Sequence, residues 1–489
     1  MGSSNGGPSN GRSGSRRLVS RRQVLGGMAA GAGLLAAGGR GSSWAAQAPA
    51  RRSGLILAPG TRPNPGLPEG VDTMPQVEHI IIYMQENHSY DNYFGLLGRG
   101  DGLTLDSGGR PTNTNPDLND DPVSMFHMNS TCDTLHSASQ SWNASHISWN
   151  NGAMDGFVRA ADGGTGSMGY WDGTDLPFYY GLANTFPICD RWFSSVLGQT
   201  YPNRRYLLAG TSVGIVSTKI DEVLATPTAP NGIIFDRLND HGISWNDYAF
   251  DLPDIALWPT FFSANGGHIK NYNDFLTDCS TGALPQVSII SPGGTTYTEE
   301  DPADIQNGEA YSSAVINAVM HGPAWEKTVL LFMYDEHGGS YDHVPPPAAV
   351  APDGIAPRIT VPPDQPGDFA QYGMRVPAFI ISPFAKKNYV SHVVHDHTSV
   401  LKFIETKFNL GAMTYRDANA DNLLDSLDFA HPGFMEPPVL PAFGLPATGS
   451  VCQPLPLPQT EPIAVTTTTT LAADPAGAHP VNATPTFTG

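Results

Sequence analysis

Two apolar segments that each end in acidic side chains constrain the fold of this chain most strongly. Residues 77–85 and 328–334 are rich in β-branched and aromatic side chains, and each predicts a buried strand. Oxygen-bearing side chains follow both strands directly: Glu86 and Asn87 after the first, and Asp335 and Glu336 after the second. Ligands of open α/β sheets bind in the crevice at the carboxyl ends of the strands. We therefore expect these side chains to meet at one edge of an α/β sheet.

The same side chains predict a metal site. Carboxylate and amide oxygens are hard ligands that suit Ca²⁺, Mg²⁺ or Mn²⁺. Neither segment carries a lysine or arginine near its acids, so these acids would repel one another in a cleft without a cation. We expect one divalent, oxygen-ligated metal ion, held by Glu86, Asn87, Asp335 and Glu336. The alternative is that these residues are separate, exposed loop residues.

A third segment supplies a candidate nucleophile. Pro202 suits the first turn of a helix that begins near Thr200. A hydroxyl at a helix start lies in a positive field, which holds phosphate oxygens and favours an oxygen nucleophile. Thr200 is therefore the candidate nucleophile, and the alternative is a helix cap without chemistry.

Strands and helices alternate along the central part of the chain. We expect strands at residues 77–85, 243–249, 287–290, 328–334 and 375–381, and helices near 203–211, 231–240, 307–321 and 397–408. This alternation predicts an α/β fold, with a largely parallel central sheet flanked by helices on both faces. Glycine-rich and proline-rich stretches predict long loop insertions at about 98–200 and 344–371. Ser291-Pro292 and Ser382-Pro383 close two strands alike, which predicts that both pairs lie at one edge of the crevice.

Five motifs along the chain carry a family resemblance. They are ENHSYDNYFG (86–95), SWNNGAMDGF (148–157), TYPNR (200–204), DEHGGSYDHVPPP (335–347) and GMRVPAFIISP (373–383). In this order they resemble the bacterial phosphoesterase family of phospholipases C and acid phosphatases, a branch of the alkaline-phosphatase-like superfamily. The resemblance spans roughly residues 77–410 and implies the fold of that superfamily.

The resemblance also implies a mechanism. One metal ion would be bound by Glu86, Asn87, Asp335 and Glu336, with Thr200 in the nucleophile position. The metal would bind the Thr200 oxygen and a phosphoryl oxygen, lower the pKa of the hydroxyl and stabilise the developing charge. A phosphothreonine would form, and water would hydrolyse it. His146, just before SWNNGAMDGF, would contact phosphate and protonate the leaving group. Substrate contacts are expected from Asn203, His268 and His343, and His397 is a further candidate.

One position departs from the family pattern. Relatives carry a His-Pro pair before the helix that precedes the second metal strand, whereas this chain reads Glu299-Glu300-Asp301-Pro302. Another histidine could take the missing place, or an acid with a raised pKa could donate the proton. A third alternative is a different substrate, because an additional acid disfavours a dianionic monoester and favours a diester.

The resemblance therefore implies a metal-dependent phosphoesterase of the phospholipase C or acid phosphatase type. It leaves open whether the substrate is a monoester or a diester, and a lipid or a soluble compound. The alternative function is a secreted or surface binding protein that keeps the fold without turnover. The missing histidine motivates this alternative, while Thr200 and the complete set of metal positions argue against it.

The N-terminus predicts export. Ser20-Arg21-Arg22-Gln23 precedes a weakly apolar, Gly/Ala-rich run, and Ala46-Gln47-Ala48 offers a small-residue cleavage site. We expect a twin-arginine signal at 1–48, a linker at 49–76, a catalytic domain at 77–430 and a C-terminal extension at 431–489 with a low-complexity tail. The mature protein would be periplasmic or secreted.

The net charge of the chain restricts the classes of molecule that it is expected to bind. Loss of residues 1–48 removes six of the 26 basic residues and none of the 46 acidic ones, which leaves a net charge of −26. Such a surface disfavours nucleic acid and anionic lipid, so we expect at most transient membrane contact. The composition does not set an oligomeric state.

Cys132, Cys189, Cys279 and Cys452 permit two disulfides in an exported protein, or remain as free thiols.

Overall fold

The computed structural model describes residues 55–132, 139–292, 297–360, 364–444, 452 and 457–462. The expected signal peptide and the threonine-rich tail lie outside these residues. None of the described helices is long and apolar enough to cross a membrane.

A mixed sheet of eight strands forms the centre of the fold, in the order β12-β6-β11-β10-β1-β9-β7-β8. Its strands are β1 (His79–Gln85), β6 (Ile188–Cys189), β7 (Trp245–Ala249), β8 (Ile269–Asn271), β9 (Val287–Ser291), β10 (Thr328–Tyr334), β11 (Ala378–Ile381) and β12 (Val390–Ser391). Neighbouring strands are parallel except at β11, which is antiparallel to both β10 and β6. The predicted α/β fold with a largely parallel sheet is confirmed.

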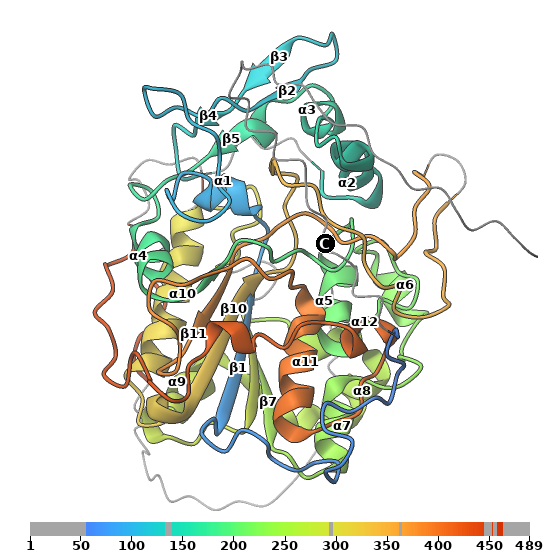
Figure 1. Ribbon diagram of the computed structural model, residues 1–489, viewed down its shortest axis with the longest axis vertical. Coiled ribbons are helices and arrows are strands. Elements are labelled where there is room, and N and C mark those ends of the chain that lie inside the picture. The colour runs from blue at the N-terminus through green and yellow to red at the C-terminus, as the bar shows by residue number, and fades with distance from the viewer. Residues whose placement is uncertain are drawn as a thin grey trace, which may run out of the picture. The chain divides into compact units, whose positions relative to one another are not determined.

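Helices cover both faces of the sheet (Figure 1). On one side lie α4 (Pro177–Thr185), α9 (Tyr272–Thr281) and α10 (Ile305–Met320), and on the other α5 (Thr200–Ala209), α7 (Ile234–Asp240) and α11 (His397–Phe408). Every residue of β10 and all but the first of β1 are buried, as expected of central strands that helices cover on both faces. The shorter helices are α6 (Ile220–Leu224), α8 (Pro259–Ala264) and α12 (Tyr415–Ala418).

An insertion lies above the carboxyl ends of the central strands (Figure 1). It contains α1 (Tyr90–Phe94), β2 (Thr114–Pro116), β3 (Pro122–Ser124), β4 (Phe126–His127), α2 (Trp142–Trp149), α3 (Phe157–Ala160) and β5 (Gly169–Tyr170). Phe157 and Met168 of the insertion pack with Tyr341 and Met374, which lie outside it, in a separate small hydrophobic core. The predicted long loops at 98–200 thus form, as far as β5, a packed layer over the edge where ligands of α/β sheets bind, whereas α4 and β6 belong to the central sheet and its covering helices.

The prediction that the two Ser-Pro pairs share an edge was wrong. Ser291 ends β9, which is parallel to β1. Strand β11 is antiparallel to β10, and the hydroxyl of Ser382 donates to the carbonyl of Thr328, the first residue of β10. Ser382-Pro383 therefore lies at the opposite end of the sheet. An apolar run predicts a strand but carries no information about its direction.

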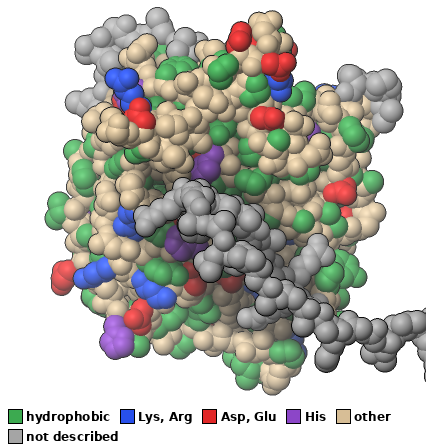
Figure 2. All heavy atoms as spheres, turned by 45° about the horizontal axis from the view of Figure 1, so that its top comes forward, with side chains coloured by type: hydrophobic (Ala, Val, Ile, Leu, Met, Phe, Trp, Pro, Cys, Tyr) green, Lys and Arg blue, Asp and Glu red, His purple; other side chains and the backbone are tan. Residues whose placement is uncertain are grey.

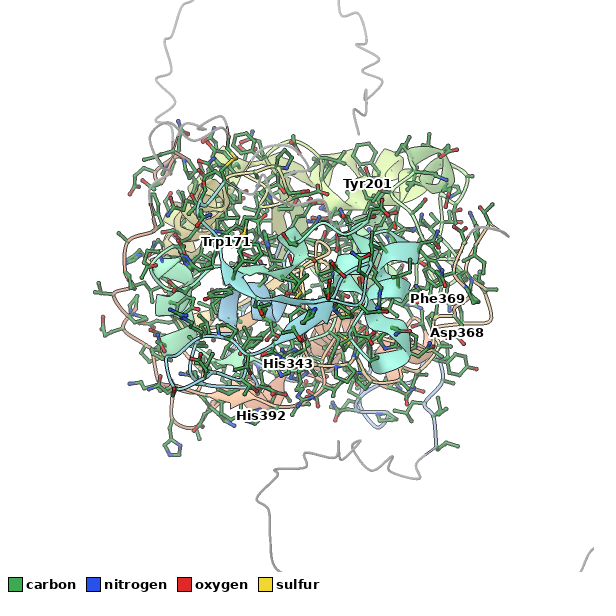
Figure 3. All side chains as sticks on the ribbon, turned by 90° about the horizontal axis from the view of Figure 1, so that it is seen from above. Trp171, Tyr201, His343, Asp368, Phe369 and His392 are labelled. Carbon is green, nitrogen blue, oxygen red and sulfur yellow. A yellow bond between two sulfur atoms is a disulfide. The ribbon has the colours of Figure 1, made fainter. Side chains whose placement is uncertain are left out.

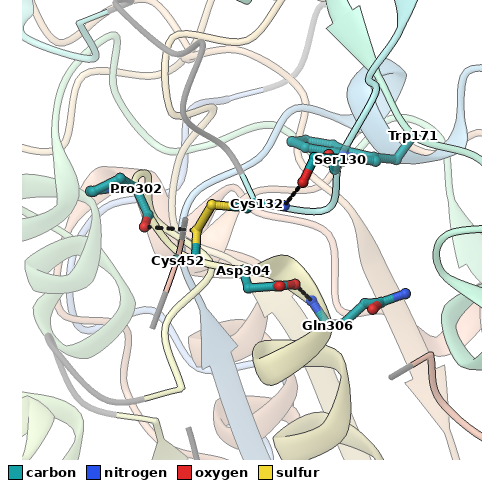
Figure 4. Close-up of a disulfide and its surroundings, with 7 residues drawn as sticks. All are labelled: Ser130, Cys132, Trp171, Pro302, Asp304, Gln306 and Cys452. Carbon is teal, nitrogen blue, oxygen red and sulfur yellow. Dashed lines mark hydrogen bonds between the residues drawn. A yellow bond between two sulfur atoms is a disulfide. The ribbon is translucent and has the colours of Figure 1, made fainter. Parts of the chain in front are cut away.

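One disulfide joins Cys132 to Cys452 across a sequence separation of 320 residues (Figure 4). Sγ of Cys452 also lies 3.4 Å from the carbonyl oxygen of Pro302. Cys189 and Cys279 are buried free thiols. The sequence left two alternatives open, two disulfides or four free thiols. The structure has one disulfide and two free thiols.

Candidate active site

The acidic ends of β1 and β10 meet at one edge of the sheet. The two strands are parallel neighbours, and their last residues, Gln85 and Tyr334, are paired. The amide of Asp335 donates to the carbonyl of Gln85 at 3.1 Å, so Glu86 and Asp335 leave adjacent strands side by side. The expectation that these two segments converge is confirmed.

Arg204 links this edge to helix α5. Its Nε donates to Asp335 at 3.0 Å, its Nη2 to Glu86 at 3.0 Å and its Nη1 to Asp254 at 2.8 Å. All these side chains are buried. Asp254 begins the short 3₁₀ helix Asp254–Leu257. Thr200 stands four residues before Arg204 and therefore shares its helix face, so the arginine anchors the face that carries the candidate nucleophile.

Burial makes this cluster of acids unfavourable as free anions. It raises the pKa of Glu86 and Glu336 well above the ordinary value and that of Asp335 to about 7, although Arg204 lowers the pKa of Glu86 and Asp335. A single guanidinium cannot neutralise three or more buried carboxylates. The site therefore has a deficit of positive charge that a divalent cation would meet.

The polar atoms left without partners fit a metal ion. Neither Oδ1 nor Nδ2 of buried Asn87 has a hydrogen-bond partner among the described residues, and Oε1 of Glu336 has none either. Oε2 of Glu336 accepts from the amide of Gly338 at 2.7 Å, which fixes the carboxylate. Unpartnered buried oxygens are rare, and hard oxygen donors are the ligands that Ca²⁺, Mg²⁺ and Mn²⁺ prefer.

Tighter clusters of His, Asp and Glu occur elsewhere in the described part of the chain. Their potential ligand atoms all lie within 4.8 Å of one another, and the groups are Asp91/Asp342/His343, His127/Asp172/Asp175 and His395/Asp421/Asp425. Glu86, Asp335 and Glu336 do not form such a group, and Arg204 bridges two of them. The chain thus offers several groups that could bind a metal.

Thr200 is the first residue of α5, after Gln199 as N-cap. Its side chain is largely buried, and its hydroxyl makes no hydrogen bond to the described residues. Asn203 fixes the preceding loop, because its side chain accepts from the amide of Val196 and donates to the carbonyls of Gly198 and Gln199. Asn203 was expected to contact substrate, but these bonds use its amide group to position the loop before Thr200.

His146 lies on α2 with its ring against Trp142, at 4.1 Å between ring centroids. Nδ1 lies 2.7 Å from the carbonyl of Trp142 and can only donate to it, which leaves Nε2 unprotonated in the neutral ring. Burial lowers the pKa of the imidazole. In this state His146 would accept a proton rather than donate one.

The structure does not bring the other two predicted histidines to Thr200. His268 stacks on Trp245, the first residue of β7, and therefore lies at the amino end of the sheet, opposite Glu86. His343 forms ion pairs with Asp91 and Asp101. Seen from above the carboxyl ends, His343 lies well apart from Tyr201, the neighbour of Thr200 (Figure 3). Figure 2 views the molecule obliquely, with the same edge turned forward, and shows histidine side chains (purple) at the surface near the centre of the view.

The comparison with known families decides the identity. The model of the Phosphoesterase family matches residues 77–411. This chain belongs to that family. The matched range contains both acidic strand ends, α5 and the insertion above the sheet, so the family resemblance and the geometry point to the same edge.

Several relatives of this phosphoesterase are named phospholipases C. The chain is 31% identical to the non-hemolytic phospholipase C of Pseudomonas aeruginosa, over 80% of this chain and 63% of that protein. It is 31% identical to phospholipase C B of Mycobacterium tuberculosis, over 82% and 86% of the two chains. The non-specific phospholipase C4 of Arabidopsis thaliana is 29% identical over 68% of each. These relatives and the family place the chain among hydrolases of phosphoric ester bonds.

Among solved structures, the fold is similar to a protein of the alkaline phosphatase superfamily from Vibrio parahaemolyticus. The TM-score is 0.34 at 10% sequence identity, and the match covers 68% of this chain and 78% of that one.

Glu299 and Glu300 stand in the segment where the phosphoesterase lacks a histidine. Glu299 is buried and accepts hydrogen bonds from the hydroxyls of Tyr93, Tyr179 and Tyr334. Glu300 shares a hydrogen bond with Glu86 and accepts one from Gln140 at 2.8 Å. The segment therefore brings an additional carboxylate, rather than an imidazole, to the end of β1.

Further residues support the site from behind. Nε2 of His397, a further candidate from the sequence, lies 2.7 Å from the carbonyl of Asp335. Nε2 of His337, which was not predicted, lies 3.0 Å from the hydroxyl of Ser145 on α2. Arg204 and Asp254 were also missed as site residues. Arg204 could have been found from its spacing, because it lies one helical turn after Thr200, whereas Asp254 carries no local signal.

Proposed function

We propose that this phosphoesterase is an exported, metal-dependent hydrolase that cleaves phosphodiesters in the manner of a phospholipase C. The observation that carries the proposal is the set of buried acids and amide at the ends of β1 and β10, which Arg204 joins to the helix of Thr200. The carboxyl edge of the sheet thereby combines three features: a site for a metal cation, an oxygen nucleophile, and a helix N-terminus that can bind phosphate.

Glu86, Asn87, Asp335 and Glu336 would hold the metal. When bound, a divalent ion supplies positive charge that lowers the pKa of an attacking hydroxyl and stabilises charge on phosphoryl oxygens. Arg204 keeps Glu86 and Asp335 in place, and Gly338 fixes the Glu336 carboxylate through its amide. These contacts orient the ligands before substrate arrives.

Thr200 performs the covalent step. Its Oγ forms a bond to phosphorus while the bond from phosphorus to the leaving alcohol breaks, and the proton lost by the Thr200 hydroxyl passes to the alcohol oxygen. Water then cleaves the phosphothreonine and restores the hydroxyl. Asn203 keeps the loop before Thr200 fixed, and the amides at the start of α5 face the phosphoryl oxygens. Unprotonated Nε2 of His146 is suited to activate that water.

A diester fits this site better than a monoester. Glu300 adds a carboxylate beside Glu86, and a dianionic monoester would meet more repulsion there than a singly charged diester. The names of the relatives agree with a phospholipid diester, since phospholipases C act on phospholipids. A mature chain with a net charge of −26 favours zwitterionic over anionic lipid and disfavours nucleic acid as a partner.

The test is a substrate panel with the purified protein. p-Nitrophenyl phosphate, p-nitrophenyl phosphocholine and phosphatidylcholine vesicles are each incubated with Mn²⁺, Ca²⁺ or Mg²⁺, and with a chelator. We expect hydrolysis of the two diesters, loss of activity with the chelator, recovery with metal and weaker turnover of the monoester.

The alternatives give different results in the same panel. Preferred turnover of p-nitrophenyl phosphate would identify an acid phosphatase instead. If all three substrates remain intact with every metal while vesicles or phosphocholine still bind, the protein is a binding protein that retains the fold. Full activity in the presence of the chelator would remove the metal from the proposal.

A further inference from the structure

A second cluster of possible metal ligands lies far along the chain from the acids described above. His395 precedes α11, Asp421 stands in the loop after α12, and Asp425 lies in the 3₁₀ helix Leu424–Ser426 that follows this loop. Potential ligand atoms of these residues all lie within 4.8 Å of one another. The histidine side chain is fully buried, whereas the two acids are partly exposed, so one side of the cluster opens to solvent.

Hydrogen bonds fix the state of the imidazole. The hydroxyl of Ser391 donates to Oδ2 of Asp425 at 2.5 Å and lies 3.1 Å from Nε2 of His395. Because the single hydroxyl proton is used, Nε2 must carry the proton and donate to Ser391. Nδ1 of the neutral ring is then left with its lone pair.

This lone pair faces a carboxylate. Nδ1 lies 3.5 Å from Oδ1 of Asp421 and has no hydrogen-bond partner among the described residues, and Oδ1 of Asp425 has none either. Two electron-rich atoms that face each other in a buried place repel unless a cation lies between them. The amide of Leu423 donates to Oδ1 of Asp421 at 2.9 Å and thereby holds this carboxylate in place.

No basic side chain supplies that charge in the described part of the chain. Neither Asp421 nor Asp425 forms an ion pair with a lysine or arginine there. Lys386 donates instead to the backbone carbonyl of Asp425 and lies over the ring of Tyr389. In the cluster of Asp91, Asp342 and His343, by contrast, Arg375 already occupies that role.

We propose that His395, Asp421 and Asp425 bind a divalent cation that accepts an imidazole nitrogen, such as Mn²⁺ or Zn²⁺. Metal bonds of about 2.0–2.2 Å place neighbouring ligand atoms about 3–3.5 Å apart, which matches the spacing of Nδ1 and Asp421. Ser391 would orient the histidine as the supporting partner that ligating imidazoles usually have. The assignment does not depend on the proposed catalytic metal.

Such an ion would connect parts of the chain that are separate in sequence. It would join the loop around residues 421–425 to the segment between β12 and α11. His397, two residues after His395, contacts the carbonyl of Asp335 at the end of β10. The ion would therefore stabilise the support of the candidate active site without touching substrate.

The experiment counts metal in the full chain. Purified protein is stripped with chelator, dialysed against Mn²⁺ or Zn²⁺ and analysed by elemental mass spectrometry, with thermal unfolding followed in parallel. We expect Asp421→Asn, and Asp421→Asn with Asp425→Asn, to bind one ion fewer per chain than the wild type. The rise in Tm that added metal gives the wild type should shrink or disappear in both variants.

Two controls separate this site from others. Asp172→Asn with Asp175→Asn neutralises the exposed cluster at His127 and should leave the metal count unchanged. Glu336→Gln tests the candidate active site alone, and the loss caused by Asp421→Asn should be the same in its presence. Since Asp421 is partly exposed, its single substitution should leave the fold intact, which circular dichroism checks.

An equal metal count in Asp421→Asn and the wild type would overturn the proposal. So would a change in Tm on substitution that is independent of added metal, because the cluster would then hold only a protonated histidine between two acids. Loss of the ion in the His127 control instead would place the second site there.

Discussion

Two buried arginines hold acidic side chains in this molecule, and they leave their surroundings in different states. Arg375 donates to Asp342 and Asp91 and also to the carbonyls of Asp101 and Asp190. Arg204 donates to Glu86, Asp335 and Asp254, while Oε1 of Glu336 and the side-chain amide of Asn87 have no hydrogen-bond partner among the described residues. The acids around Arg375 have hydrogen-bond partners, whereas the group around Arg204 retains polar atoms that have none among the described residues.

The pKa values follow this difference in part, because burial also raises the pKa of Asp342 beside Arg375, to about 6. Burial alone would raise the pKa of Asp91, but His343 and Arg375 bring it below its ordinary value. Around Arg204, burial prevails and raises the pKa of Glu86 well above the ordinary value. A buried arginine with enough partners stabilises structure, whereas one that leaves acids unneutralised marks a place for further charge.

The largest expected effect is on chemistry at the Arg204 side. Thr200→Ala should lower kcat/KM for a phosphodiester by at least about 10³-fold, because the substitution removes the attacking oxygen. Thermal unfolding should be nearly unchanged. Thr200→Ser should retain part of the activity and Thr218→Ala nearly all of it. Retained turnover in Thr200→Ala would mean that another residue is the nucleophile.

The next largest effect should fall on stability at the Arg375 side. Arg375→Met leaves Asp91 and Asp342 buried without their partner, which should lower the free energy of unfolding by about 3–5 kcal/mol. Urea unfolding measures this. Arg191→Met, which breaks a partly exposed pair with Asp101, should cost less than about 1 kcal/mol. Equal losses in the two variants would remove the distinction between a satisfied buried network and a surface pair.

Removal of one proposed metal ligand should act on activity more than on stability. Glu336→Gln should reduce kcat/KM about 10²-fold and raise the metal concentration needed for half-maximal activity. Steady-state kinetics against metal concentration measures both, and the exposed Glu326→Gln is the control. If Glu336→Gln leaves the metal requirement unchanged, the ion is bound elsewhere.

The smallest effect concerns pH at the Arg375 side. Burial alone would lower the pKa of His343, but Asp91 and Asp101 raise it to about 10. The charged form is thus stabilised in the folded state, and its contribution is complete below about pH 6.5 and lost as the pH rises through about 10. Relative to His343→Gln, the wild type should be more stable by about 1.5–3 kcal/mol at pH 6. Urea unfolding at pH 6, 8 and 10.5 should show this difference shrinking, with the exposed His431→Gln as control; a difference that grows with pH would contradict the assignment.

The sequence predicted the central sheet well because its buried strands are long and apolar. Residues 328–334 form β10 with these bounds, and 77–85 contain β1. The direction of β11 and the small strands β6 and β12 escaped prediction, since each depends on partners far along the chain. Prediction succeeded for strands that a local sequence pattern determines. It failed for strands whose position or direction depends on pairing with distant segments.

The same reasoning explains the outcome at the site. Glu86 and Asp335 were found because strand ends are visible in the sequence, and their convergence follows from parallel pairing. His268 was misplaced because a histidine in a plain loop gives no sign of the sheet end at which it lies. Asn203 was predicted to contact substrate. In the structure its side-chain amide instead forms hydrogen bonds with the backbone of Val196 and Gly198, and these bonds cannot be read from the sequence.

The covalent link between Cys132 and Cys452 has a practical consequence. A protease that cuts the backbone once anywhere between these positions produces two fragments that stay attached to each other. Such a nicked molecule should migrate as a single species on a denaturing gel and separate only after reductant is added.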